Sequence, residues 1–177
     1  LKELMQSVPI YTLKAWNANL DKDGVAKGDG FWEISPLFES PLGLFEAGED
    51  GDALFKDYGI QPRYLKYIMS PWAVKRLKEA EGDLAKFKVV KMHPDILQQI
   101  GITKVEPGDE NNQDISSLVG KVNISDLEEY DQNDPDAYNW VGGLNVASQG
   151  IMEFVEMFKA PIKMLHPLLT ATQEGHY

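Results

Sequence analysis

The stretch GIMEFVEMFKAPIKMLHPLLTATQEG, residues 150–175, carries the clearest structural pattern in the chain. Residues 150–156 predict a short strand that ends in an acidic residue, Glu156. A polar turn follows, and apolar residues then recur at near-helical spacing from Ile162 onwards. Pro167 predicts the start of a fresh helix, because proline breaks a helix interior. The helix is expected to end before the glycine of the closing Gln-Glu-Gly.

A strand that ends in a carboxylate and is followed by a helix is the layout of a Walker B element. In such a nucleotide site one carboxylate binds Mg²⁺ and another polarises the attacking water. Glu156 is placed for the second role. The usual aspartate before it is replaced by Val155, which cannot ligate a metal. The pattern alone leaves open a second interpretation, in which Glu156 is a solvated residue at a strand end.

A phosphate-binding loop of the form Gly-x-x-x-x-Gly-Lys-Ser/Thr has no match in the 177 residues. Gly120-Lys121 is followed by Val122, and no glycine stands five residues before Gly120. Such a loop supplies the backbone amides and the lysine that hold the phosphates. We therefore expect the chain by itself neither to bind ATP tightly nor to catalyse ATP hydrolysis or phosphoryl transfer.

Composition excludes several classes of protein. With 43% hydrophobic and 25% charged residues in 177, the chain is expected to fold as one globular domain. A net charge of −11 disfavours nucleic acid as a partner, because phosphates require compensating Lys and Arg. The absence of cysteine excludes disulfides and thiolate chemistry. No apolar run approaches the roughly 20 residues of a membrane span, and no secretory signal opens the chain, so we expect a cytoplasmic protein and no membrane contact.

Six further segments have predicted structure. Residues 17–53 hold many Gly, Asp, Asn and Pro residues and predict a long loop or an insertion. The other predictions are a strand over 8–13, two helices in 62–80 that divide at Ser70-Pro71, a half-buried strand over 86–92, a short helix from Asp95 to Ile100, and a helix from Asp126 behind the capping box Ser125–Glu128.

Two acidic loops, 21–30 and 106–114, raise the possibility of a calcium-binding domain. The first departs from the calcium-loop pattern, because Val25 and Ala26 stand where an oxygen ligand and the obligatory glycine belong. Solvated turns are the favoured interpretation of both loops. The three histidines have no ligand spacing, so no metal-ligand set is predicted.

The run 150–175 closely resembles the PrkA family of bacterial serine protein kinases, in their AAA+ domain. The resemblance continues in YLKYIMSPWAVKRL (64–77), EPGDENNQDISSLVGKV (106–122) and YDQNDPDAY (130–138). It implies an α/β fold of the three-layer P-loop NTPase (AAA+) type, with a parallel sheet that is incomplete because the Walker A strand and loop are absent. Residues 1–177 would be a partial AAA+ domain, from the end of the Walker A helix to the helix after the Walker B strand. A piece of a longer protein is therefore expected.

The resemblance also implies site residues and partners. Glu156 matches the Walker B glutamate, a catalytic and cofactor-binding position. Glu174 matches a recurrent AAA+ element that often faces a neighbouring subunit, and a solvated helix end is its alternative. The parent protein would use ATP and Mg²⁺, act on a protein substrate and form a homo-oligomer. A second hypothesis, favoured by Val155, is a non-catalytic interaction or scaffold module derived from an AAA+ ATPase.

Overall fold

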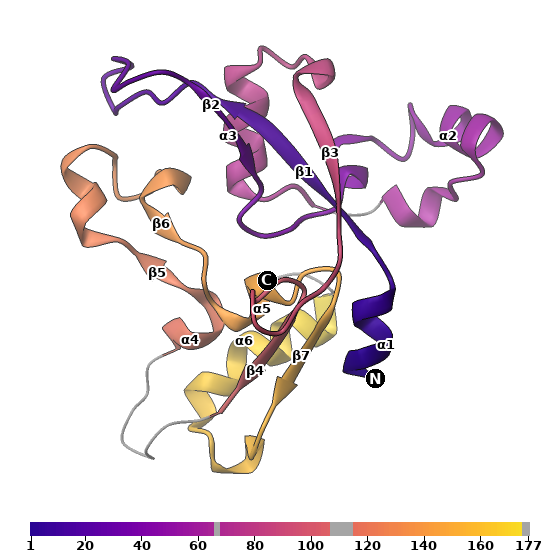
Figure 1. Ribbon diagram of the computed structural model, residues 1–177, viewed down its shortest axis with the longest axis vertical. Coiled ribbons are helices and arrows are strands. Elements are labelled where there is room, and N and C mark those ends of the chain that lie inside the picture. Colours follow the sequence, from indigo (N-terminus) through magenta and orange to yellow (C-terminus); the bar gives the residue numbers. More distant parts are fainter. Residues whose placement is uncertain (66–67, 107–114, 175–177) are drawn as a thin grey trace. The chain divides into compact units, whose positions relative to one another are not determined.

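The computed structural model describes residues 1–65, 68–106 and 115–174, and these divide into two compact units. Unit 1 comprises Leu1–Ile10, Pro36–Phe38 and His93–Tyr177. Unit 2 comprises Tyr11–Ser35 and Glu39–Met92. Figure 1 labels the helices and strands of both units, and each unit is described by itself below.

Unit 1 is built around a parallel pair of short strands, β4 and β7. Its elements are, in chain order, α1 (Lys2–Ser7), β4 (Ile102–Val105), α4 (Ser116–Val119), β5 (Lys121–Val122), η4 (Ile124–Glu128), η5 (Pro135–Ala137), β6 (Tyr138–Asn139), α5 (Gly143–Val146), β7 (Ile151–Phe154), η6 (Met157–Lys159) and α6 (Ile162–Glu174). The parallel register runs from Ile102 opposite Ile151 to Val105 opposite Phe154. The strand predicted at 150–156 is therefore confirmed.

The core of unit 1 lies on one face of this pair. Val105, Leu118 and Met164 are buried there, and Met152 and Phe154 of β7 pack against them. Met152 and Phe154 point to the same side because alternate residues of a strand share a face. Figure 1 shows α6 lying across this face of the pair. Full burial of a side chain of this size contributes roughly 1.5–3 kcal/mol, so α6 is held chiefly by apolar packing.

Two glycines fix the start of β7 against the start of β4. Ile151 N donates to Gly101 O at 2.8 Å. A Cβ atom added to Gly150 would overlap the carbonyl oxygen of Gly101. Gly101 itself has a φ of +64°, in the left-handed region that glycine adopts without strain. The two backbones therefore meet closely enough to exclude a side chain at residue 150.

Unit 2 holds a three-stranded sheet with the order β2-β1-β3. Its elements are β1 (Ile10–Asn17), which begins at the boundary with unit 1, then β2 (Phe31–Ile34), η1 (Pro41–Leu44), α2 (Gly51–Tyr58), η2 (Pro62–Leu65), α3 (Pro71–Glu79), η3 (Leu84–Lys86) and β3 (Phe87–Met92). β1 and β2 are antiparallel, with Trp16 opposite Trp32. The strand predicted at 86–92 is confirmed, as is the helix that begins at Ser70-Pro71.

The start of α3 shows how the sequence defines its own boundary. Ser70 Oγ accepts a hydrogen bond from Ala73 N at 3.1 Å, and Pro71 occupies the first helical turn. The Glu39 carboxylate then accepts from Ser70 Oγ at 2.5 Å and from Ser70 N at 3.0 Å. An acceptor at this position satisfies amides that have no partner within the helix.

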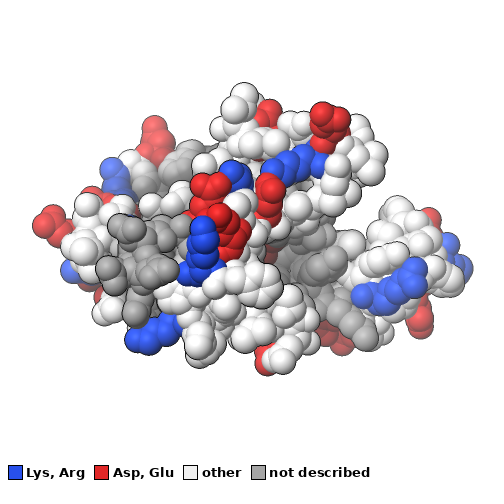
Figure 2. Space-filling view, turned by 90° about the horizontal axis from the view of Figure 1, so that it is seen from below, with Lys and Arg blue, Asp and Glu red and all other residues white. Residues whose placement is uncertain are grey.

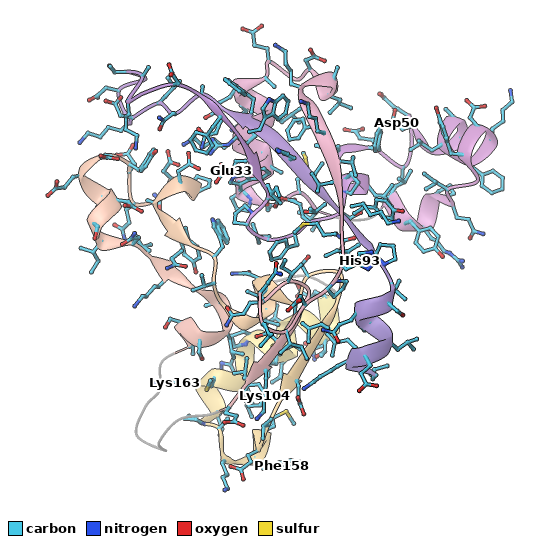
Figure 3. All side chains as sticks on the ribbon, viewed as in Figure 1. Glu33, Asp50, His93, Lys104, Phe158 and Lys163 are labelled. Carbon is cyan, nitrogen blue, oxygen red and sulfur yellow. The ribbon has the colours of Figure 1, made fainter. Side chains whose placement is uncertain are left out.

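A buried charge network fixes α3 against β2. The Arg76 side chain is 0% exposed, and it donates to Glu33 at 3.2 Å and to Glu79 at 3.0 Å. Glu33 also accepts from Trp72 Nε1 at 3.3 Å and from Asn17 Nδ2 at 3.0 Å. Figure 3 labels Glu33 on β2, beside α3. A buried charge is tolerated only when it is paired and hydrogen-bonded in this way.

Several predicted elements differ in the structure. The strand expected at 8–13 as part of a parallel sheet runs over 10–17 instead and pairs antiparallel with β2. Residues 95–100 form a turn rather than a helix, because Asp95 Oδ1 accepts from Leu97 N and Gln98 N. The helix expected from Asp126 is the 3₁₀ turn η4, which Asn123 caps.

The prediction that Pro167 begins a helix is wrong. α6 runs from Ile162 to Glu174 and contains Pro167 in its interior, where the proline is buried. The helix begins directly after Pro161, whose carbonyl oxygen accepts from Met164 N at 2.9 Å. Proline removes a single backbone donor, and the apolar face of α6 continues on both sides of it.

The mixed α/β class is confirmed, with small sheets in both units. The strands β4 and β7 pair in parallel, whereas the pairs β1–β2 and β5–β6 are antiparallel. The expected insertion at 17–53 contains β2 and η1. Its Asp21 closes a turn by accepting from Asp23 N and Val25 N. Most of the acidic loop 106–114 lies outside the described residues.

The surface of the chain carries both signs of charge. Figure 2 shows Asp and Glu interspersed with Lys and Arg on the face that it draws.

Within residues 1–65, 68–106 and 115–174, every helix is too short or too polar to cross a lipid bilayer.

Candidate functional site at the end of strand β7

The carboxyl end of β7 places Glu156 at the edge of the parallel pair. The backbone ladder extends one residue beyond the strands, because Val155 N donates to Val105 O at 2.9 Å. At the next residue, Glu156, the backbone turns away with φ 52° and ψ 39°, and η6 follows. Carboxyl ends of parallel strands are the usual place for ligands in α/β proteins. Glu156 is therefore positioned as the sequence predicts.

The conformation of Glu156 is unusual for its residue type. Its φ and ψ lie in the left-handed region, which side chains other than glycine seldom adopt. Such a conformation costs on the order of 1–3 kcal/mol and persists only where surrounding contacts impose it. The contacts here are the Val155–Val105 bond before Glu156 and the turn η6 after it. Strain of this kind is found more often at functional sites.

The Glu156 carboxylate is accessible and has one cationic neighbour. Lys159 Nζ lies 3.0 Å from Glu156 Oε2, and the side chains are 66% and 57% exposed, respectively. Lys159 N also donates to Glu156 O at 2.8 Å. The same short turn thus fixes both the main chain and the side chain of the pair. A carboxylate has two oxygens, so Oε1 remains available to another donor.

The residues around Glu156 that the structure describes supply too few ligands for a metal site made of protein side chains alone. Val155 supplies no oxygen at the position beside Glu156. In the described part of the chain, no three His, Asp or Glu side chains lie close enough together to hold a metal ion. Mg²⁺ is often bound by only one or two carboxylates, with phosphate and water oxygens completing its shell. Mg²⁺ held chiefly by phosphate and water oxygens would need no direct bond from Glu156, whose predicted role is toward the attacking water.

A row of charges lies on the face of the strand pair opposite the core. Lys104 of β4 stands opposite Glu153 of β7, with Lys2 of α1 bonded to Glu153. Lys104 also pairs with Glu106. The hydrogen bond from Lys2 lowers the pKa of Glu153, and the hydrogen bond with Glu106 raises the pKa of Lys104. Figure 3 labels Lys104.

Sequence reasoning missed this row of charges. The strand β4 was not predicted, although its sequence Ile-Thr-Lys-Val is rich in β-branched residues that favour strands. The pairing of Lys2 with Glu153 spans 151 residues, and no local pattern reports a contact of that separation.

Glu174, the second predicted site residue, is not brought to Glu156. It is the last residue of α6, which has 13 residues. At about 1.5 Å per residue, the helix separates its two ends by on the order of 20 Å.

The strand, turn and helix around Glu156 form a parallel α/β arrangement, and the comparison with known families specifies the family to which the chain belongs. The chain belongs to the PrkA AAA domain family, whose profile matches residues 1–177. The resemblance seen in the sequence is therefore confirmed.

Two relatives illustrate the match. The chain is 62% identical over all 177 residues to the serine/threonine kinase YeaG of Escherichia coli strain K12, of which it covers 25%. It is 37% identical over 144 residues, 80% of the chain, to the ATP-dependent protease PrkA of Bacillus subtilis strain 168, of which it covers 22%. The chain thus spans about a quarter of the length of these relatives. No solved structure matches it.

Proposed function

We propose that this chain is part of the ATP-hydrolysing AAA+ core of a protein that phosphorylates serine or threonine residues of a protein substrate. The observation that carries the proposal is the position of Glu156, an accessible carboxylate at the carboxyl end of a parallel strand. Membership of the PrkA AAA domain family supports it. So does the name of the Escherichia coli relative, a serine/threonine kinase.

Glu156 acts in this proposal on the attacking water. Its free carboxylate oxygen accepts a hydrogen bond from the water and orients the water toward the terminal phosphate. Bound Mg²⁺ would neutralise charge on the phosphates. Glu174 would contribute to a nucleotide site from a neighbouring subunit, which requires a homo-oligomer. Cytoplasmic location belongs to the same proposal.

The test uses the full-length protein that contains this chain. Glu156→Gln keeps the size of the side chain and removes the basic oxygen, so ATP turnover should fall by roughly 10²–10⁴-fold. ATP affinity, measured by titration calorimetry in the presence of Mg²⁺, should change little. Glu153→Gln, within β7 and three residues before Glu156, is the matched control and should retain turnover. Normal turnover by Glu156→Gln would contradict the proposal.

A second candidate function is a non-catalytic scaffold derived from an AAA+ ATPase. Val155 favours it, because the position beside Glu156 lacks the usual metal-binding oxygen. Under this hypothesis the full-length protein neither binds nor hydrolyses ATP, and Glu156→Gln changes nothing.

We propose further that the 177 residues alone bind no ATP, since they contain no phosphate-binding loop. Calorimetric titration of the isolated chain tests this directly.

A further inference from the structure

We propose that Lys159 is a positioning residue for Glu156: it holds one carboxylate oxygen so that the other faces the attacking water. The inference rests on the proposed function of Glu156 and adds a residue to it. Its basis is the 3.0 Å contact between Lys159 Nζ and Glu156 Oε2.

The first step of the argument is the backbone around the pair. The left-handed conformation of Glu156 redirects the chain just after β7. Lys159 N then donates to Glu156 O at 2.8 Å, and Ala160 N donates to Met157 O at 3.0 Å. These two bonds close the turn and bring the residue three positions later back to Glu156. The lysine side chain therefore starts close to the carboxylate.

The second step is the exposure of the pair. Both side chains are more than half exposed, and an ion pair of this kind contributes only about 0–1 kcal/mol to stability. Phe158, between them in the turn, is 97% exposed, and Figure 3 shows it pointing away from the turn. A contribution to stability is therefore a weak reason for the pair. Restriction of the carboxylate to one orientation is the effect that the geometry supports.

The third step is the chemistry of the carboxylate. With Lys159 on Oε2, the remaining oxygen, Oε1, can accept from water. A base that is fixed in this way need not lose rotational freedom during the reaction. Errors of about 1 Å in the position of a reacting group can cost on the order of 10²-fold in rate. Loss of the lysine should therefore slow turnover and leave nucleotide binding unchanged.

The kinetic test compares variants of the full-length protein. Lys159→Met should lower kcat for ATP hydrolysis roughly tenfold, with KM for ATP within about twofold of the parent. Lys159→Arg should restore most of the rate, because it keeps a cation at the same distance. Lys163→Met, on the first turn of α6, is the matched control and should behave as the parent. Turnover by Lys159→Met that equals Lys163→Met would overturn the proposal.

A double substitution separates positioning from general damage. Because Lys159 acts through Glu156, Glu156→Gln combined with Lys159→Met should be no slower than Glu156→Gln alone. An additional tenfold loss in the double variant would contradict the role. If Glu156→Gln alone keeps full turnover, the proposed function fails and this inference fails with it. If Glu156→Gln is inactive and Lys159→Met is fully active, only the role of Lys159 fails.

A readout that needs no nucleotide completes the test. Reductive methylation followed by peptide mass spectrometry measures the reactivity of each lysine in the protein. Glu156→Gln should raise the labelling rate of Lys159 relative to that of Lys163, because the amine is no longer held against a carboxylate. An unchanged ratio would show that the pair does not form in solution and would overturn the proposal.

Discussion

Two ion pairs of this chain, one in each unit, have opposite surroundings. In unit 2 Arg76 is completely buried and donates to both Glu33 and Glu79. In unit 1 Glu156 and Lys159 meet on an exposed turn, with more than half of each side chain open to solvent. Breaking a buried pair leaves a charge without a partner, whereas an exposed pair is replaced by water at little cost. The Arg76 pair therefore stabilises the fold, whereas the Glu156–Lys159 pair contributes little to stability and is accessible for a reaction.

The carboxylates of the two ion pairs, Glu33 and Glu156, also differ in their hydrogen bonds and in the strain of their backbone. In the network around Arg76, the neighbouring Trp72 and Asn17 supply further hydrogen bonds to Glu33 Oε2, which also accepts from Arg76. Glu156 instead combines a strained backbone with an oxygen open to other donors. Residues that are unfavourable for stability and open to solvent are typical of sites where function outweighs folding.

The largest effect on stability is expected from Arg76→Met. Loss of the guanidinium leaves Glu33 and Glu79 without their shared cation. Both carboxylates are partly exposed, at 31% and 22%, so we expect a loss of about 1.5–3 kcal/mol, the range for hydrogen bonds to charged groups. Urea unfolding of the chain, followed by tryptophan fluorescence, measures the change. A loss of unfolding free energy below about 1 kcal/mol would contradict the conclusion that the Arg76 pair stabilises the fold more than the exposed Glu156–Lys159 pair does.

A smaller but clear loss is expected from Gly150→Ala. The added methyl group would overlap the Gly101 carbonyl, so β7 must shift against β4. We expect a loss of more than about 1 kcal/mol, since alanine does not fit the native backbone there. Gly48→Ala is the control, because a Cβ atom at Gly48 meets nothing within 4 Å. Equal stability of the two variants would show that the close approach is absent in solution.

Ser70→Ala should cost about 1 kcal/mol, within the range of 0.5–2 kcal/mol typical of an N-cap. The serine accepts from Ala73 N and donates to Glu39, so both contacts are lost together. Ser70→Asn, which can still cap the helix, should recover much of the stability in the same urea measurement. Failure of Ser70→Asn to recover any stability would assign the loss to Glu39 rather than to the cap.

The smallest change in stability is expected for Glu153→Gln, and the size of this change depends on pH. Lys2 lowers the pKa of Glu153, so the folded chain binds the acidic proton less readily than the unfolded chain. The stabilising contribution is thus complete above the ordinary pKa of glutamate and is lost as the pH falls through the lowered value. The difference in stability between the parent and Glu153→Gln should shrink over that acidic range. A difference that is constant with pH would contradict the pairing.

The sequence predicted those features that local patterns control. The strand that ends at Glu156, the cap at Ser70 and the strand at 86–92 each follow from neighbouring residues. Pro167 misled the prediction because tertiary packing carries α6 through a proline that propensity would place at a helix start.

Contacts between distant residues could not be predicted in the same way. Arg76 and Glu33 are 43 positions apart, and nothing in either neighbourhood identifies the other as its partner. The strand pairing of β4 with β7, which places Glu156 at the edge of the pair, likewise depends on residues about 50 positions apart. The role proposed for Glu156 rests on the resemblance and the strand pattern, and its left-handed backbone was visible only in the structure.

The most direct test of the difference between the two pairs is to measure stability and ATP turnover together for Glu156→Gln. Turnover is measured in the full-length protein, and the free energy of unfolding is measured in this chain. We predict a fall in turnover of at least about 10²-fold, with a change in unfolding free energy within about 0.5 kcal/mol. Unchanged turnover, or a loss of stability as large as that of Arg76→Met, would contradict the assignment of Glu156 to chemistry rather than to the fold.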